Sequence, residues 1–362
     1  MRLATLLRVF LHSPGAVNLM DLIADFPEFF LPRCTLRRIH RRDVDAIFAG
    51  LSHPQVIAHY GVSYNSLEAT DEQMRWYDAL LEERRGIWWG IALPGRDEWV
   101  GACGFNDWSH ADRCLDIGYW LMPDYWGRGL MQACLPTLLR FALSNLGVHR
   151  IHADVEPENP ASARLLERLG FVFEGTLREL EYKDKRFLSL HQYSLLATDP
   201  AAQALLADET PILRPCHGAD APALSALARR SKAHWGYPEA WMEAWEPALT
   251  LTPAQLTGHY AVLVAADGPP LGFYGLERDE DGWQLEHCWV DPSAMNGGHG
   301  RRLVEHALAV ARGLGVSTLS VESDPSAQAF YERLGARHVR NVSRPVCGEP
   351  RQLPVLEWWL GE

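Results

Sequence analysis

The sequence predicts an α/β protein with two domains in tandem, and three observations support this. The chain of 362 residues is too long for one ordinary hydrophobic core, and its composition, 47% apolar and 22% charged, is typical of a globular protein. The pattern LRxxHxxDxxA at Leu36–Ala46 recurs at Leu213–Ala223. The segment Pro160–Gly170 recurs, in the same order, as Pro325–Gly335. Two colinear repeats indicate a duplicated architecture.

The repeats also set the expected boundaries. We expect residues 1–30 to form a poorly ordered leader, residues 31–198 the first domain and residues 211–362 the second. Residues 199–210 are rich in Ala and Asp and contain a proline, so they are expected to form a linker or a linking helix.

Both halves show the same order of elements. A short strand leads through Asp43 or Asp220 into a helix, and each Asp is expected to cap that helix with its carboxylate. A second helical segment and three apolar strands follow, of which the last two in the second half are joined by an acidic hairpin turn. These elements are expected at Thr35–Ile39, Thr70–Arg84, Ile87–Leu93, Trp99–Trp108 and Leu115–Leu121, and again at Pro211–Arg214, Pro238–Ala244, Tyr260–Ala266, Leu271–Leu276 and Trp283–Val290.

Composition excludes several classes of protein. The net charge is −12 and there is no basic run, which argues against a nucleic-acid partner. No apolar run is long enough to cross a bilayer, so no membrane association is expected. The seven cysteines are scattered without a CxxC pair, which predicts neither a metal site nor a disulfide framework. Reduced thiols in a cytoplasmic protein are the expected state.

Glycines stand where a strand turns into a helix in the first half. The strand Leu115–Leu121 runs through Met122 into Trp126-Gly127-Arg128-Gly129-Leu130-Met131, and a helix follows to about Leu146. Glycines let the backbone approach a ligand closely, and a helix N-terminus presents unpaired amides to an anion. The pattern predicts a pyrophosphate cradle, although a tight turn without a ligand would read the same way. It is neither a Walker loop nor a dinucleotide fingerprint.

A helix just past the strand Arg150–Val155 provides the second motif. Asn159 is expected to cap this helix, and Ser162 lies on one face of it with Leu166. With the phrase Ile117–Leu121 and the glycine turn, this motif resembles the RimJ/RimL-type branch of the GNAT superfamily of N-acetyltransferases. The resemblance covers about Arg33 to Ala197. It implies a mixed, mainly antiparallel sheet flanked by helices, with acetyl-CoA as co-substrate.

The resemblance also implies roles for residues of the first half. Residues of the turn would hold the CoA pyrophosphate after the strand end at Met122: Gly127, Arg128, Gly129, Leu130 and Met131. Asn159 would contact the pantetheine arm. Ser162 would act as a general acid near the thiolate, and Asp116 stands where the family often has an acidic residue. Leu166 departs from the tyrosine that many relatives carry.

The second half resembles a generic GNAT domain from about Ile212 to Leu360. Its expected cradle follows Val290 and contains Gly298, Gly300 and Arg301, with Met295 in place of the usual Gln or Arg. Tyr331 stands at the general-acid position. Glu286 or its neighbour His287 could accept the amine proton, and strand parity cannot choose between them, because this strand commonly carries a bulge.

An aromatic cluster precedes the strands of the second half. Trp241 and Trp245 share a helix face, which is most often core packing. Together with Tyr237 they could instead hold an amine by cation–π attraction in the acceptor site.

The sequence therefore predicts two tandem acyl-CoA-dependent N-acyltransferase domains that move an acetyl group to a primary amine, either a protein N-terminus or a small molecule. One active domain beside a degenerate one is the first alternative. An acyl-CoA-binding sensor without turnover is the second. The chain could assemble as a homodimer.

Overall fold

The computed structural model describes residues 26–93, 99–183, 185–265 and 268–361, and the first 25 residues of the expected leader lie outside these ranges. The chain forms two compact units. Unit 1 consists mainly of Arg38–Gly90 and Val100–Asp208, and unit 2 mainly of the residues from Glu209 onward. The segment Pro27–Arg37 belongs to unit 2 although it precedes unit 1 in the chain.

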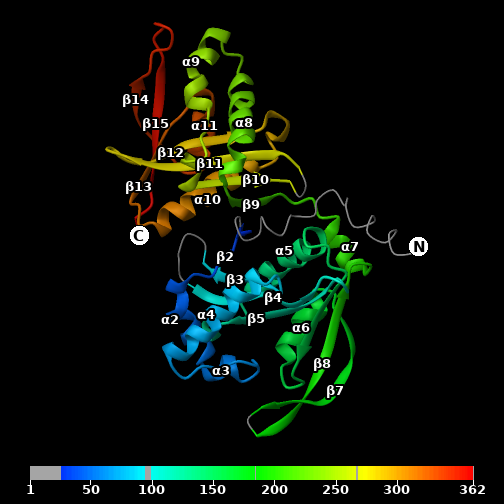
Figure 1. The fold of residues 1–362 in the computed structure, drawn as a ribbon. Helices are drawn as coiled ribbons and strands as arrows, with labels where there is room; N and C mark the ends of the chain where they lie inside the picture. Colours follow the sequence, from blue (N-terminus) through cyan, green and yellow to red (C-terminus); the bar gives the residue numbers. More distant parts are fainter. Residues whose placement is uncertain (1–25, 94–98, 184, 266–267, 362) are drawn as a thin grey trace, which may run out of the picture. The chain divides into compact units, whose positions relative to one another are not determined.

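Unit 1 carries a mixed sheet in the order β3-β4-β5-β6-β8-β7, in which β5 and β6 are parallel (Figure 1). Its elements are η1 (Arg41–Asp43), α2 (Val44–Leu51), α3 (Pro54–Ile57), α4 (Leu67–Glu82), β3 (Ile87–Ala92), β4 (Trp99–Ser109), β5 (Cys114–Leu121), η2 (Pro123–Tyr125), α5 (Leu130–Ser144), β6 (Arg150–Val155), α6 (Pro160–Arg168), β7 (Val172–Lys183), β8 (Arg186–Leu196) and α7 (Pro200–Leu206).

Alternation along the strands distributes side chains between the two faces of the unit 1 sheet. Trp88 packs against Trp76 and Tyr77 of α4, whereas its neighbour Trp89 packs against Phe141 of α5. A Cβ added to Gly118 of β5 would meet the ring of Trp88, so Gly118 faces α4. The next residue, Tyr119, therefore faces α5 and α6.

Unit 2 carries a second mixed sheet, in the order β14-β15-β13-β12-β11-β10-β9-β1-β2. Among the strand pairs of unit 2 in the described part of the chain, only β12 and β13 are parallel. Its elements are β1 (Phe29–Phe30), β2 (Thr35–Arg38), β9 (Ile212–Pro215), η3 (Gly218–Asp220), α8 (Ala221–Ala233), α9 (Glu239–Leu249), η4 (Gln255–Thr257), β10 (His259–Val264), β11 (Pro270–Asp279), β12 (Gly282–Val290), η5 (Pro292–Ala294), α10 (His299–Gly313), β13 (Thr318–Glu322), η6 (Pro325–Ala327), α11 (Gln328–Arg333), β14 (Arg337–Ser343) and β15 (Gln352–Trp359).

Two hydrophobic cores cover the two faces of the unit 2 sheet. Ala261 and Leu263 of β10 belong to the core formed with α10 and α11, whereas Tyr260 and Val262 belong to the core formed with α8 and α9. The predicted α/β class, with mainly antiparallel sheets flanked by helices, is confirmed. Within the described ranges every helix is too short or too polar to serve as a membrane span.

The prediction that Asp43 and Asp220 cap the helices that follow them is wrong. Each carboxylate accepts a hydrogen bond from a backbone amide three residues upstream, at His40 (2.7 Å) and His217 (2.8 Å), rather than from the helix that follows. The cause is a 3-10 turn between strand and helix, which the sequence pattern did not reveal. The helix expected at Pro238–Ala244 also runs further, to Leu249.

Phe30 links the early segment to the core of unit 2. It pairs with Leu213 of β9, its ring stacks on His306 with centroids 4.5 Å apart, and it packs against the α10 core. We predict that Phe30→Ala lowers the free energy of unfolding by about 2 kcal/mol, since a half-buried ring loses roughly half of what a buried one contributes. Urea unfolding of the full chain measures this.

The matched control is Phe187→Ala, because Phe187 is 63% exposed. It should change the stability by less than about 0.5 kcal/mol. Equal losses for the two variants would show that Phe30 contributes nothing to the core.

Candidate active sites

Both units contain a parallel strand pair that separates soon after it forms. In unit 1, β5 and β6 pair from Cys114 to Asp116 and no further, although β5 continues to Leu121. In unit 2, β12 and β13 pair only at Trp283 and Gln284. The first strand of each pair, β5 or β12, then leads into a glycine turn and a helix. We refer to the region beyond the last pair, where the two parallel strands are no longer hydrogen-bonded to each other, as the opening of each unit.

The turn in unit 1 contains two left-handed glycines, Gly127 (φ 69°) and Gly129 (φ 71°), and Gly129 is the N-cap of α5. The first intrahelical hydrogen bond runs from Ala133 N to Gly129 O, at 3.1 Å. The amides of Leu130 and Met131 come before it, so the helix gives them no acceptor and they can bind an anion. Their side chains are buried, which fixes the start of the helix.

The turn in unit 2 has the same shape but different residues. Asn296 (φ 66°) and Gly298 (φ 80°) take the left-handed positions, and Gly298 is the N-cap of α10. Gly300 lies inside the first turn of the helix, where an added Cβ would lie 3.2 Å from the ring of Phe330. Gly300 thus serves close packing rather than the turn. Asn296 was missed, although Asn tolerates this backbone region better than most residues.

Four other residues that are expected to bind CoA lie in or next to the turns. Met122 donates its amide to Val100 O (2.8 Å), and Val290 packs against the α10 core. The Arg128 guanidinium lies over the Tyr125 ring, 5.3 Å from its centroid. Arg301 forms an exposed ion pair with Glu305 on α10.

Asn159 caps α6 as predicted, because its Oδ1 accepts the amide of Ser162 at 3.1 Å. The Ser162 hydroxyl lies 2.7 Å from that of Tyr119 on β5. Burial raises the pKa of Tyr119 to about 12, although the hydrogen bond with Ser162 opposes this. Leu166 is fully buried. No sequence pattern reveals this pair of hydroxyls, because the contact depends on how α6 packs on the sheet.

Asp116 forms an ion pair with Nε2 of His152, which lies opposite it on β6. The hydrogen bond with Asp116 raises the pKa of His152. Asp116 is therefore part of a half-buried pair rather than a solvated carboxylate at the end of a strand. His152 was missed because the register of a parallel pair cannot be read from one sequence.

A bulge decides which of Glu286 and His287 faces the opening in unit 2. Leu285 pairs with Leu276 and His287 with Gly275, which leaves Glu286 as an extra residue on β12. His287 is buried near the rings of Tyr260 and Phe273, and burial lowers its pKa.

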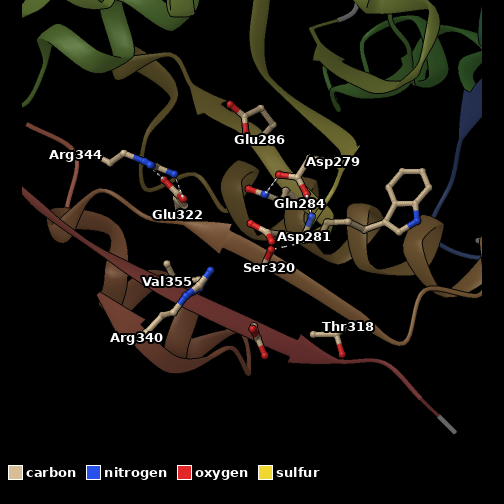
Figure 2. A pocket seen from close by; sticks show the side chains of 12 residues that line it. Asp279, Asp281, Gln284, Glu286, Thr318, Ser320, Glu322, Arg340, Arg344 and Val355 are labelled. Carbon is tan, nitrogen blue, oxygen red and sulfur yellow. Dashed lines mark hydrogen bonds and ion pairs between the residues drawn. The ribbon is translucent and has the colours of Figure 1, made fainter. Parts of the chain in front are cut away.

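Glu286 instead lines a cavity of about 340 Å³ (Figure 2). The cavity walls come from the β11–β12 hairpin and from β13, β14 and β15. Five carboxylates line it against two guanidinium groups: Asp279, Asp281, Glu286, Glu322 and Glu357 against Arg340 and Arg344. Partial burial, and then repulsion from Glu277 and Glu322, raise the pKa of Glu286.

Tyr331 lies on the opposite face of β12 from His287. It is 7% exposed, belongs to the α10 core and packs edge-on against Trp358. Burial raises the pKa of its hydroxyl well above the ordinary value, and the electrostatic interaction and hydrogen bond with the half-buried Cys288 thiol add to this. The hydroxyl therefore stays protonated.

The aromatic cluster of unit 2 does bind cations, but these are the protein's own. Lys232 Nζ lies 4.4 Å from the Trp245 ring centroid, and the Arg351 guanidinium lies 4.9 Å from it. Both cations contact Asp324 Oδ2, at 2.9 and 3.0 Å, and Tyr237 donates to the same oxygen. The rings of this cluster are thus engaged within the protein.

Asp324 joins two buried cations and should therefore stabilise unit 2. Burial alone would raise its pKa, but hydrogen bonds from Tyr237 and Lys232 lower it to about 2. We predict that Asp324→Asn costs about 3 kcal/mol at pH 7, because it leaves buried charges uncompensated. In the native chain this contribution is complete above pH 3.8 and is lost as the pH falls toward 2.

Urea unfolding at pH 7 tests the substitution, and Glu349→Gln on the exposed β14–β15 turn serves as the control. The control should remain within about 0.5 kcal/mol of the native chain. A native-like Asp324→Asn would mean that the cations do not depend on this carboxylate.

Comparison with known proteins agrees with this geometry. Residues 33–172 match the family model described as acetyltransferase (GNAT) domain, and residues 224–336 match the one described as acetyltransferase (GNAT) family. The uncharacterized N-acetyltransferase YoaA of Bacillus subtilis is 34% identical over 172 residues, which cover 47% of this chain and 97% of YoaA. The L-methionine sulfoximine/L-methionine sulfone acetyltransferase of Salmonella typhimurium is 27% identical over 180 residues, covering 46% of this chain and 97% of that enzyme.

Among solved structures, Mycobacterium smegmatis RimJ in complex with CoA-disulfide is 25% identical, with a TM-score of 0.44, and the match covers 50% of this chain and 92% of RimJ. With two family matches in one sequence and a relative aligned over nearly its whole length, the chain belongs to the GNAT family of acyl-CoA-dependent N-acetyltransferases and contains two GNAT domains.

Proposed function

We propose that both domains transfer an acetyl group from acetyl-CoA to a primary amine by direct attack, with base and acid assistance. One observation carries this proposal: each unit has a separated parallel strand pair that ends in a left-handed turn and unpaired helix amides. Family membership alone would allow one of the two domains to have lost its cradle.

The residues of the turns fit the pyrophosphate of CoA. Amides of Gly129, Leu130 and Met131 in the first domain, and of Gly298 and the first turn of α10 in the second, would bind its oxygens with help from the helix dipole. Arg128 and Arg301 would add positive charge at the rim. Acetyl-CoA supplies the activated acyl group, and the chain positions it in the opening between the strands.

The second domain is proposed to act on a cationic amine. An excess of carboxylates in the cavity beside Glu286 would attract an ammonium group. Glu286 would then accept a proton from the ammonium and leave its lone pair free to attack. The raised pKa makes Glu286 a better base, and Tyr331 would donate to the departing sulfur.

The first domain would use Asp116 with His152 for proton removal, and Ser162 on the other face of the sheet as the donor. Its acceptor is either a protein N-terminus or a small-molecule amine. A single active domain remains the second candidate, because Asn296 and Met295 make the second turn less typical than the first.

Two binding sites should therefore be measurable. We predict that calorimetric titration of the full chain with acetyl-CoA gives two sites, and that Gly298→Ala weakens one of them. A Cβ at φ 80° strains the turn by roughly 1–2 kcal/mol.

Gly348→Ala is the matched control, because Gly348 has φ 81° and open space around it but lies outside both turns. It should leave both sites intact. A native chain with only one site would support the one-domain alternative. Two sites without thiol release, across a panel of amines, would support the alternative of an acyl-CoA-binding sensor without turnover.

Two carboxylates of the cavity in the second domain are predicted to have different roles, Glu286 in catalysis and Asp281 in binding the acceptor. In a chain whose first domain carries Asp116→Asn, we predict that Glu286→Gln lowers the remaining kcat about 10²–10⁴-fold and removes the acidic limb of the pH–rate profile, since the base must be ionised to act. Asp281→Asn, at the hairpin turn of the same cavity, should mainly raise KM for a cationic amine. Thiol release with a polyamine acceptor measures both parameters. An unchanged kcat for Glu286→Gln would exclude the carboxylate as the base.

A further inference from the structure

We propose that Tyr119 is a positioning residue of the first domain: its hydroxyl donates to Ser162 Oγ and thereby directs the Ser162 proton at the departing sulfur. This inference rests on the proposed function of that domain and adds a residue to its mechanism. Tyr119 supplies the phenol that the closing helix lacks, because Leu166 stands where the second domain has Tyr331.

The contact is short and well anchored. The two hydroxyl oxygens are 2.7 Å apart, and the Ser162 amide is fixed by Asn159 Oδ1 at 3.1 Å. Tyr119 lies on β5 beyond its last pair with β6, in the part of the strand that borders the opening. It comes four residues before Pro123 and the turn that would bind the pyrophosphate.

The second domain has a related contact between the corresponding strand and helix, but it uses a helix position one turn further along. Cys288 stands four residues before Pro292, as Tyr119 stands before Pro123, and Tyr331 stands seven residues after Asp324, as Leu166 stands after Asn159. In the second domain the helix provides the phenol, which is hydrogen-bonded to the strand thiol of Cys288. In the first domain the strand provides the phenol and the helix provides a smaller hydroxyl. Each domain thus places one tyrosine hydroxyl between β5 and α6, or between β12 and α11.

The direction of the hydrogen bond follows from the two acidities. A buried phenol with a pKa of about 12 stays protonated over the working pH range and can act as a constant donor. Once Ser162 Oγ accepts that proton, its own O–H is free to point toward another acceptor. Hydrogen bonds in such a chain strengthen one another.

The chemical step balances without proton loss from the tyrosine. The amine nitrogen forms a bond to the acetyl carbon, the carbon–sulfur bond breaks, and its electron pair goes to sulfur. A thiol has a pKa near 8.5, so a phenol with a pKa of about 12 would not transfer its proton fully. Ser162 instead donates a hydrogen bond to the developing thiolate, which takes its proton from solvent on release. The proton lost by the amine goes to Asp116 and His152.

The experiment uses the full chain with Glu286→Gln, which suppresses turnover by the second domain. In this background Tyr119→Phe should lower kcat about 10–100-fold, the loss typical of a partner that orients a catalytic group. The Kd for acetyl-CoA should not change. Ser162→Ala should lower kcat at least as much, and the double variant should be no slower than Ser162→Ala alone.

Tyr193→Phe is the matched control, because Tyr193 lies on β8 and its hydroxyl makes a long contact, 3.4 Å, with Glu167. It should keep full turnover. A Tyr119→Phe variant with native kcat would overturn the inference, as would one that loses acetyl-CoA affinity together with turnover, or losses that add in the double variant. A background chain that binds acetyl-CoA but never releases thiol would instead overturn the proposed function of the first domain, and the inference with it.

Discussion

The separation of one parallel strand pair is the constraint on which the rest of each domain depends. Parallel strands that stayed paired would satisfy their backbone groups but leave no room for a ligand. Here β5 and β6 pair at three positions and β12 and β13 at two, and the chain then turns away. The turn, the helix amides and the contact between Tyr119 and Ser162 lie at the end of the strands where this separation occurs. The cavity beside Glu286 extends the other way, along the paired part of β12 and β13 to the β11–β12 hairpin. The sheet of unit 2 remains stable because antiparallel neighbours and helices on both faces bury its core.

In the proposed mechanism, the groups that take the proton from the amine and the group that donates to the leaving thiolate lie on opposite faces of the sheet. Alternation along β5 directs Tyr119 toward α6 and places Asp116, which pairs with His152 at the last parallel position, on the other face of the strand. In the second domain Leu285 and Cys288 lie on the same face although they are three residues apart, because Glu286 is the extra residue of a bulge. The base that deprotonates the amine and the donor to the leaving thiolate can thus act without forming a hydrogen bond with each other.

The domains share this frame but differ in their charges. The second domain has an acidic cavity next to its strand opening, and its aromatic cluster is occupied by Lys232 and Arg351, which share Asp324. In the first domain a buried carboxylate, Glu156, is instead paired with His59 (2.9 Å) and Lys183 (3.2 Å). The hydrogen bonds from these two side chains lower the pKa of Glu156 against the effect of burial. Different acceptors for the two domains are consistent with these differences.

The sequence by itself determined the fold class, the duplication, the two strand–turn–helix segments and the cap at Asn159, because periodicity, glycine and capping residues act over a few neighbouring positions. It could not decide between Glu286 and His287, it assigned Gly300 to a turn that Asn296 forms, and it did not reveal His152, Tyr119 or the cations on Trp245. These depend on a bulge, on the register of a parallel pair and on how helices pack against a sheet. Such features are set by contacts between segments far apart in the chain, and only the tertiary structure decides them.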